Sequence, residues 1–133
     1  MAYSATVVRY GPYIADGRRY WQVECSETDA GASDEWSFSA GPGPASIVTI
    51  VHFVSTHDSG SGSTVQPKLG TKTGLGAIDT RLQFDAAAAE VSDASHVTFA
   101  LDDSDGKIYV RTTADSGADN VQSSRITYCE GAP

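Results

Sequence analysis

The sequence of 133 residues is poor in the residue types that mark several common classes of protein. It contains two cysteines and one methionine, and its 9 Lys and Arg are outnumbered by 17 Asp and Glu. The net charge of −8 disfavours nucleic acids and anionic membranes as partners, because both require a basic surface. Two cysteines are also too few for a disulfide-framed mini-protein or for a zinc site.

Long apolar runs are missing as well. The longest, residues 47–54, includes Thr49 and His52 and is far too short to span a bilayer. Residues 1–10 lack the basic start and the apolar stretch of a signal peptide. We therefore expect a chain that is made in a cytosol and leaves it only as part of an assembly.

What the chain does contain is a regular alternation of β-prone segments and loops rich in Gly, Ser, Pro and Asp. Strands are predicted at residues 3–10, 18–27, 35–39, 47–54, 80–84, 97–101, 107–113 and 120–129. The segment 47–54 is apolar on nearly both faces, which predicts a central strand. About eight strands at this spacing predict a single domain, residues 1–133, folded as an antiparallel β-sandwich or a jelly-roll-like barrel.

The connections between these strands are predicted from Gly and Pro. Breaks are expected at Gly11 and Pro12, at Asp16-Gly17 and in the segments 28–34, 41–44 and 57–63. The Asp-rich turn at 102–106 is expected to join the segments 97–101 and 107–113 as a hairpin. Residues 85–92 hold the only helical pattern, with Asp85 as its candidate N-cap. Residues 68–80 follow no clear pattern.

The two cysteines are predicted to differ in environment. Cys25 alternates with Trp21 and Val23, so we expect it to be a small core residue. Cys129 shares a strand face with Thr127 and Arg125, which indicates a more exposed position. A bridge between the two cysteines would close a very long loop and could add roughly 4–5 kcal/mol in the chain-entropy model. A reducing compartment favours two free thiols instead.

Two loops carry residues that could bind ions. Asp102, Asp103 and Asp105 precede a glycine, but the spacing of an EF-hand is absent and a turn explains them. The glycines at positions 70, 74 and 76 accompany Lys68 and Lys72, but the spacing of a phosphate-binding loop is absent. We therefore assign no metal ligands, no cofactor and no cofactor-binding residues.

The ingredients of a nucleophilic triad occur between residues 55 and 61. His57 and Asp58 lie near the serines at 55, 59 and 61, but sequence neighbours rarely face each other productively. We interpret them as a polar loop, assign no catalytic residues and expect no enzymatic activity. His52 is predicted to be buried and hydrogen-bonded. His96 has no partner that the sequence identifies.

Aromatic residues crowd the N-terminal part of the chain. They are Tyr3, Tyr10, Tyr13, Tyr20 and Trp21. Packing within strands is the interpretation we favour, because aromatic side chains are favoured there. Aromatic faces also stack on sugar rings, so a carbohydrate-binding or tail-fibre-like receptor-binding module is the alternative function. A hydrolase of unrecognised type, suggested by His57 and Asp58 alone, is a third possibility.

Five segments, which follow one another over most of the chain, carry a family resemblance. They are 19–24 (RYWQVE), 33–38 (SDEWSF), 66–70 (QPKLG), 105–111 (DGKIYVR) and 117–120 (GADN). Together they resemble a group of small bacteriophage virion proteins that decorate or cement the capsid shell. The richness in Ala, Gly, Ser and Thr and the acidic balance are similar to that group.

The resemblance implies a non-enzymatic structural protein with a β-sandwich fold. It would be made in the cytoplasm of a bacterial host, bind the major capsid protein on the virion surface and stabilise the head. Self-association as a dimer or trimer would suit a symmetric lattice. The expected contact surfaces are the segment 1–13 and the long loops, because an edge strand pairing with the shell would satisfy open backbone groups.

Overall fold

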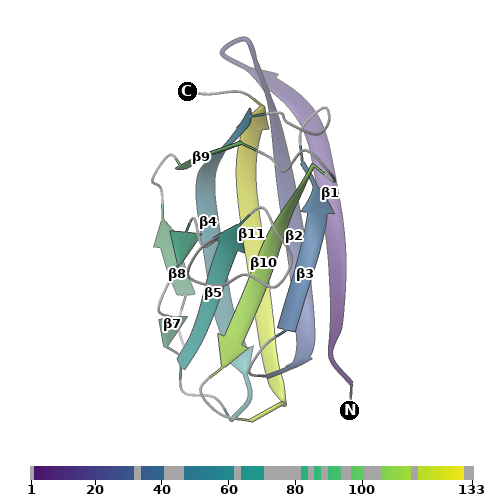
Figure 1. Ribbon diagram of the computed structural model, residues 1–133, viewed down its shortest axis with the longest axis vertical. Helices are drawn as coiled ribbons and strands as arrows, with labels where there is room; N and C mark the ends of the chain where they lie inside the picture. The colour runs from purple at the N-terminus through teal and green to yellow at the C-terminus, as the bar shows by residue number, and fades with distance from the viewer. Residues whose placement is uncertain are drawn as a thin grey trace.

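The computed structural model describes residues 2–31, 34–40, 47–61, 64–70, 82–83, 86–87, 90–93, 97–100, 106–114 and 117–130. In these ranges every regular element is a strand, and the strands form two antiparallel sheets that face each other (Figure 1). The predicted β-sandwich is therefore confirmed. None of the described segments is a helix long and apolar enough to cross a membrane.

The larger sheet contains six strands. Along its path lie β1 (Ser4–Ala15), β2 (Arg18–Ala30), β11 (Asn120–Glu130), β4 (Ile47–Ser59) and β8 (Glu90–Asp93). A further strand, β9 (Val97–Ala100), pairs with β4 beside β8. We call this sheet A. The prediction that residues 47–54 form a central strand is confirmed, because β4 lies between β11 and the pair β8 and β9.

The smaller sheet, sheet B, contains five strands. Its path is β3 (Asp34–Ser39), β10 (Lys107–Ala114), β5 (Thr64–Gly70) and β6 (Leu82–Gln83), and β7 (Ala86–Ala87) also pairs with β5. The core between the sheets comes from alternate residues that face inward. Its largest fully buried apolar side chains are Tyr128, Phe53, Ile50, Leu69, Ile108 and Ile126.

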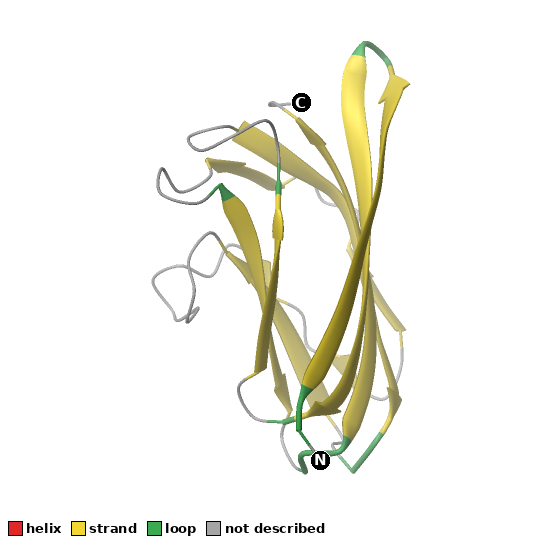
Figure 2. Ribbon diagram, turned by 90° about the vertical axis from the view of Figure 1, so that its right-hand side faces the viewer, coloured by secondary structure: helices red, strands yellow, loops and turns green. Residues whose placement is uncertain are grey.

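The hairpin of β1 and β2 projects beyond the rest of the sandwich in both views (Figures 1 and 2). Its turn is Asp16-Gly17, and both residues have positive φ, 53° and 72°. This is the geometry of a type I′ turn, whose twist suits a two-residue hairpin. A bulge at Gly11 and Pro12 shifts the register between Tyr10 and Tyr13. A Cβ at Gly11 would lie 2.9 Å from the carbonyl oxygen of Tyr20, so the close strand approach requires glycine.

Several predicted strand ends are wrong because pairing between distant segments lengthens the strands. The chain passes Gly11 and Pro12 as a bulge within β1, where a break was predicted. The strands β2 and β4 continue to Ala30 and Ser59, into segments predicted as loops. Pairing of both strands with β11 satisfies backbone groups that a loop would have left to water.

Two predicted local elements are also wrong. The segments 97–101 and 107–113 do not form a hairpin, because β9 pairs with β4 in sheet A and β10 pairs with β3 and β5 in sheet B. The helical pattern at 85–92 contributes strands β7 and β8 instead. Of the segment 80–84 only β6 is described as a strand, and residues 71–80 lie outside the described ranges.

Candidate functional site

Strand β1 is exposed along nearly its whole length. It lies at the end of sheet A and pairs only with β2, so its other edge faces no described strand. Of the six large apolar side chains that are exposed among the described residues, five lie on it: Val7 (37%), Val8 (42%), Tyr10 (50%), Tyr13 (47%) and Ile14 (68%). Both faces of one strand therefore expose apolar surface along an open hydrogen-bonding edge.

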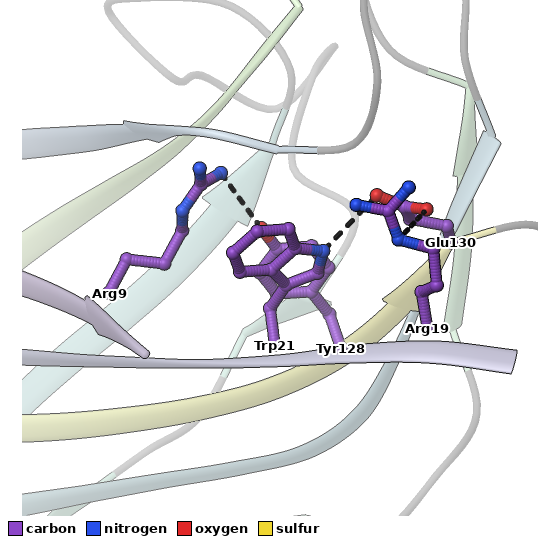
Figure 3. Close-up of polar contacts among 5 residues, drawn as sticks. All are labelled: Arg9, Arg19, Trp21, Tyr128 and Glu130. Carbon is purple, nitrogen blue, oxygen red and sulfur yellow. Dashed lines mark hydrogen bonds and ion pairs between the residues drawn. The ribbon is translucent and has the colours of Figure 1, made fainter. Parts of the chain in front are cut away.

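Arg9 fixes this edge strand to the body of the sandwich (Figure 3). Its guanidinium carbon lies 4.1 Å from the centre of the Trp21 ring, a cation–π geometry. Its Nη1 donates to the backbone carbonyl of Ser39 at 2.6 Å and lies 3.4 Å from the hydroxyl of Tyr128. Because Ser39 ends β3, this one side chain links β1 of sheet A to sheet B.

The other side of the same indole is held by Glu130. Trp21 Nε1 donates to Glu130 Oε1 at 3.1 Å, and Arg19 Nε lies 3.4 Å from Glu130 Oε2 (Figure 3). The side chain of Arg19 is half exposed, so this ion pair adds little stability. These contacts chiefly fix the orientation of Trp21. The indole is held by its hydrogen bond to Glu130 at the end of β11 and by the cation–π contact with Arg9 on β1.

The hairpin also carries a cluster of tyrosines on the outer face of sheet A. Tyr10 pairs in register with Gln22, and Tyr13 pairs with Tyr20. Because the bulge inserts one residue, Tyr10 and Tyr13 face the same side although they are three residues apart. The rings of Tyr13 and Tyr20 are stacked, with centroids 5.5 Å apart and an interplanar angle of 16°. The predicted role in strand packing accounts for Trp21, which packs against the core. Tyr10, Tyr13 and Tyr20 lie on the outer face instead.

A shallow hollow of about 350 Å³ lies on the same outer face, over β2, β11 and β4. We call it the outer-face hollow. Its outward side chains are Glu24, Ser26, Val54, Thr56, Ser123 and Arg125. Glu24 and Arg125 are partners in the β2–β11 register, and Arg125 is exposed. Gln22 Nε2 donates to Glu24 Oε1 at 3.1 Å, which orients the carboxylate.

His57 lies inside the sandwich, not in a polar loop as predicted. It is buried on β4, and its Nε2 lies 3.0 Å from Asn120 Oδ1. Asn120 Nδ2 donates to the carbonyl of Ala30 at 2.9 Å, so Oδ1 is the acceptor and His57 Nε2 carries the proton. Asp58, the next residue, is exposed and accepts a hydrogen bond from Ser123. His57 and Asp58 therefore point to opposite faces and form no triad.

Ser55, the nearest serine on the same face of β4 as His57, forms hydrogen bonds with residues of β11. Ser55 Oγ accepts from Gln122 Nε2 and lies 3.2 Å from Ser124 Oγ. These buried hydrogen bonds join β4 to β11. They form a structural network and leave no nucleophile paired with a base in this part of the described chain.

The N-terminal edge of the core holds a buried carboxylate. Glu27 is fully buried on β2 and accepts a hydrogen bond from the Tyr3 hydroxyl at 2.7 Å. Burial and the charge of Glu27 raise the pKa of Tyr3 well above its usual value, so the hydroxyl stays protonated and donates. This contact fastens the start of the chain to the inner face of sheet A.

The two cysteines are both free and both buried. Cys25 is a core residue, as predicted, and burial followed by the charge of Glu27 raises its pKa to about 12. The prediction that Cys129 is exposed is wrong, because it is 2% exposed. In the β2–β11 register Cys25 faces Ser124, five residues from Cys129, which is a separation of roughly 17 Å along the strand. A bridge between them is therefore geometrically excluded.

Other residues singled out in the sequence are placed as follows. His52 is half-buried on β4, where it was predicted to be buried. His96, the aspartates at 102, 103 and 105, Lys72 and the glycines at 74 and 76 lie outside the described residues. Sequence reasoning missed Arg9, Glu130 and the Glu24–Arg125 pair. Alternation along β2 predicts that Glu24 lies on the other face of the strand from Trp21. Only the register with β11 shows that Arg125 lies beside Glu24.

Comparison with known proteins gives a likeness of architecture only. No family model and no curated protein matches the chain. A Bacillus endospore appendage from a family of disulfide-linked pili is similar at 14% identity and a TM-score of 0.42, covering 98% of this chain and 92% of that chain. A CBM4 structure is similar at 12% identity and a TM-score of 0.43, covering 96% and 86%. A family 35 carbohydrate binding module from Clostridium thermocellum is similar at 14% identity and a TM-score of 0.34, covering 92% and 90%.

Proposed function

We propose that this protein is a non-enzymatic structural module that joins a larger protein assembly through the edge of β1. The single observation that supports the proposal is the exposure of this strand, which offers apolar side chains on both faces beside an open backbone edge. Its 12 residues extend over roughly 40 Å. An added strand from a partner would satisfy the open groups and cover this apolar surface.

The composition of β1 favours an edge that is covered by a partner protein over one that stays exposed to water. Monomeric proteins usually protect an edge strand with charges, short length or a covering segment. Here the strand sequence SATVVRYGPYIA carries one charged residue, Arg9, and that guanidinium is turned to Trp21 and Ser39. The anchoring contacts of Arg9 and Trp21 hold the edge in a defined orientation, which lowers the ordering cost of binding.

The finer identity that we propose is a decoration protein of a bacteriophage head. It rests on the resemblance of the five sequence segments to capsid-decorating virion proteins. The partner would be the major capsid protein, and a dimer or trimer of this chain would match the symmetry of the lattice. Repeated contacts over such a lattice raise the overall affinity even where each contact is weak.

The test is co-sedimentation with shells assembled from the major capsid protein encoded in the same genome. Val8→Lys and Ile14→Lys place a charge on the β1 edge, and we expect each to weaken binding at least tenfold. Ile47→Lys is the matched control, because Ile47 is 46% exposed on sheet A but lies on β4. All three side chains are exposed, so the free energy of unfolding should change by less than about 0.5–1 kcal/mol.

Failure of the wild-type protein to sediment with the shells would contradict the capsid proposal. Equal binding by the wild type and by both β1 variants would contradict the role of the edge. Loss of binding in the Ile47→Lys control alone would place the contact at the β4 end of the sheet.

A further inference from the structure

The outer-face hollow has the dimensions of a ligand site. Its volume of about 350 Å³ lies within the range of roughly 300–1,000 Å³ that is usual for small-molecule sites. It opens on the outer face of sheet A, and the neighbouring positions of β1 carry Val8 and Tyr10. Strands β2, β11 and β4 form its floor, so the site rests on the paired centre of the sheet and not on a loop.

The floor places a donor beside an acceptor. Arg125 makes no hydrogen bond or ion pair within the part of the chain that the structure describes. A guanidinium only donates hydrogen bonds, and a carboxylate such as that of Glu24 only accepts them. Two adjacent hydroxyl groups of a ligand can bond to both side chains, because a hydroxyl accepts a hydrogen bond from the guanidinium and donates one to the carboxylate. Ser26 and Thr56 add hydroxyls at the sides of the hollow, and Val54 adds an apolar surface.

Beyond the lining of the hollow, the outer face of sheet A continues toward the hairpin with aromatic side chains. Tyr10 lies beside Gln22, the residue that orients Glu24, and the stacked pair of Tyr13 and Tyr20 continues the same face. The apolar face of a sugar ring packs against aromatic rings, while its hydroxyls reach polar groups at the ring edge. Aromatic side chains next to a donor–acceptor floor provide both kinds of contact on one face of the sheet.

From this arrangement we infer that the outer-face hollow binds a neutral oligosaccharide. Glu24 and Arg125 bind adjacent ring hydroxyls, and Tyr10 stacks on the next ring toward the hairpin. The charges of Glu24 and Arg125 balance, and the chain as a whole carries −8, so an anionic polymer is disfavoured. A protein strand would occupy the open edge of β1, whereas this site lies on the face of the sheet.

The test is a titration of the intact protein with neutral hexasaccharides of glucose, mannose, xylose and N-acetylglucosamine. Amide chemical shifts and calorimetry report the binding. We expect saturable binding by at least one of them, in the millimolar to micromolar range that is typical of open, polar sites, with shifts at Glu24 and Arg125. Arg125→Ala and Glu24→Gln should each weaken binding at least tenfold, and Tyr10→Ala several-fold.

Sheet B offers a matched control for these variants. Arg111 and Glu35 form the same kind of cross-strand pair on the outer face of β10 and β3. Arg111→Ala and Glu35→Gln should therefore leave oligosaccharide binding unchanged. Each variant is first compared with the wild type by circular dichroism, so that a loss of folding is not taken for a loss of binding.

Three results would overturn the inference. They are no binding of any neutral oligosaccharide, equal weakening by the sheet A and sheet B variants, and tighter binding of an anionic hexagalacturonate than of every neutral probe. The outcome is independent of assembly through β1. Arg125→Ala is expected to sediment with capsid shells like the wild type, and Ile14→Lys is expected to keep its oligosaccharide affinity.

Discussion

Replacing Arg9 with alanine would remove the contacts that hold the projecting hairpin to the sandwich. The cation–π contact with Trp21 is worth about 0.5–1 kcal/mol at an exposed site. The hydrogen bond to the carbonyl of Ser39 adds about 0.5–1.5 kcal/mol. Because Arg9 is exposed, we take the lower part of each range and expect the free energy of unfolding to fall by about 1–2 kcal/mol.

This loss can be measured by urea denaturation followed by circular dichroism. For a chain of this size it corresponds to a fall in Tm of roughly 3–10 °C. Arg9→Lys keeps the charge but loses the planar group that stacks on the indole, so we expect a smaller loss. Hydrogen exchange should show the β1 amides becoming less protected than those of β4, because the hairpin opens before the centre of the sheet.

The control for this experiment is Arg125→Ala, which removes an exposed arginine from the middle of the same sheet. We expect its effect on stability to be within about 0.5 kcal/mol. If Arg9→Ala and Arg125→Ala lowered the free energy of unfolding equally, the contacts of Arg9 with Trp21 and Ser39 would not anchor the hairpin. Unchanged protection of the β1 amides in Arg9→Ala would refute the reasoning in the same way.

Two further predictions concern titratable groups. Burial raises the pKa of Cys25 from 9.0 to about 12, so this thiol should resist iodoacetamide in the native protein at pH 9 but react in urea. A raised pKa stabilises the folded state below pH 9, and this contribution is lost as the pH rises toward about 12, so Cys25→Ala should reduce the alkaline loss of stability. Hydrogen bonds from the hydroxyl and the backbone amide of Ser61 hold the pKa of Asp119 below its usual value. Ser61→Ala should raise that pKa in an NMR titration, and an unchanged value would contradict the assigned cause.

Local pattern was sufficient for much of the fold. The alternation of Trp21, Val23 and Cys25 predicted the inner face of β2, and the apolar segment around Ile50 predicted a central strand. The turn at Asp16-Gly17 was found from its residues, because only a few residue types tolerate positive φ. These features depend on neighbours two to four residues away, so sequence reasoning can reach them.

The candidate sites depended on partners far along the chain. Glu24 lies beside Arg125, about a hundred residues later, only because β2 and β11 pair in one register. Cys129 is buried although its strand neighbours indicated exposure, and the predicted hairpin of 97–113 divides between two sheets. Short strands of similar composition do not specify which strand they pair with.

Residue order alone specifies that this chain forms strands and which side chains along each strand share a face, because side-chain direction alternates with every residue. Strand pairing in three dimensions places β1 at the edge of its sheet, brings Arg9 onto Trp21 and forms the outer-face hollow over three strands that are distant in the sequence. Each strand edge could pair with several others. The pairing that forms is the one that lets the inward faces of all the strands pack into one core.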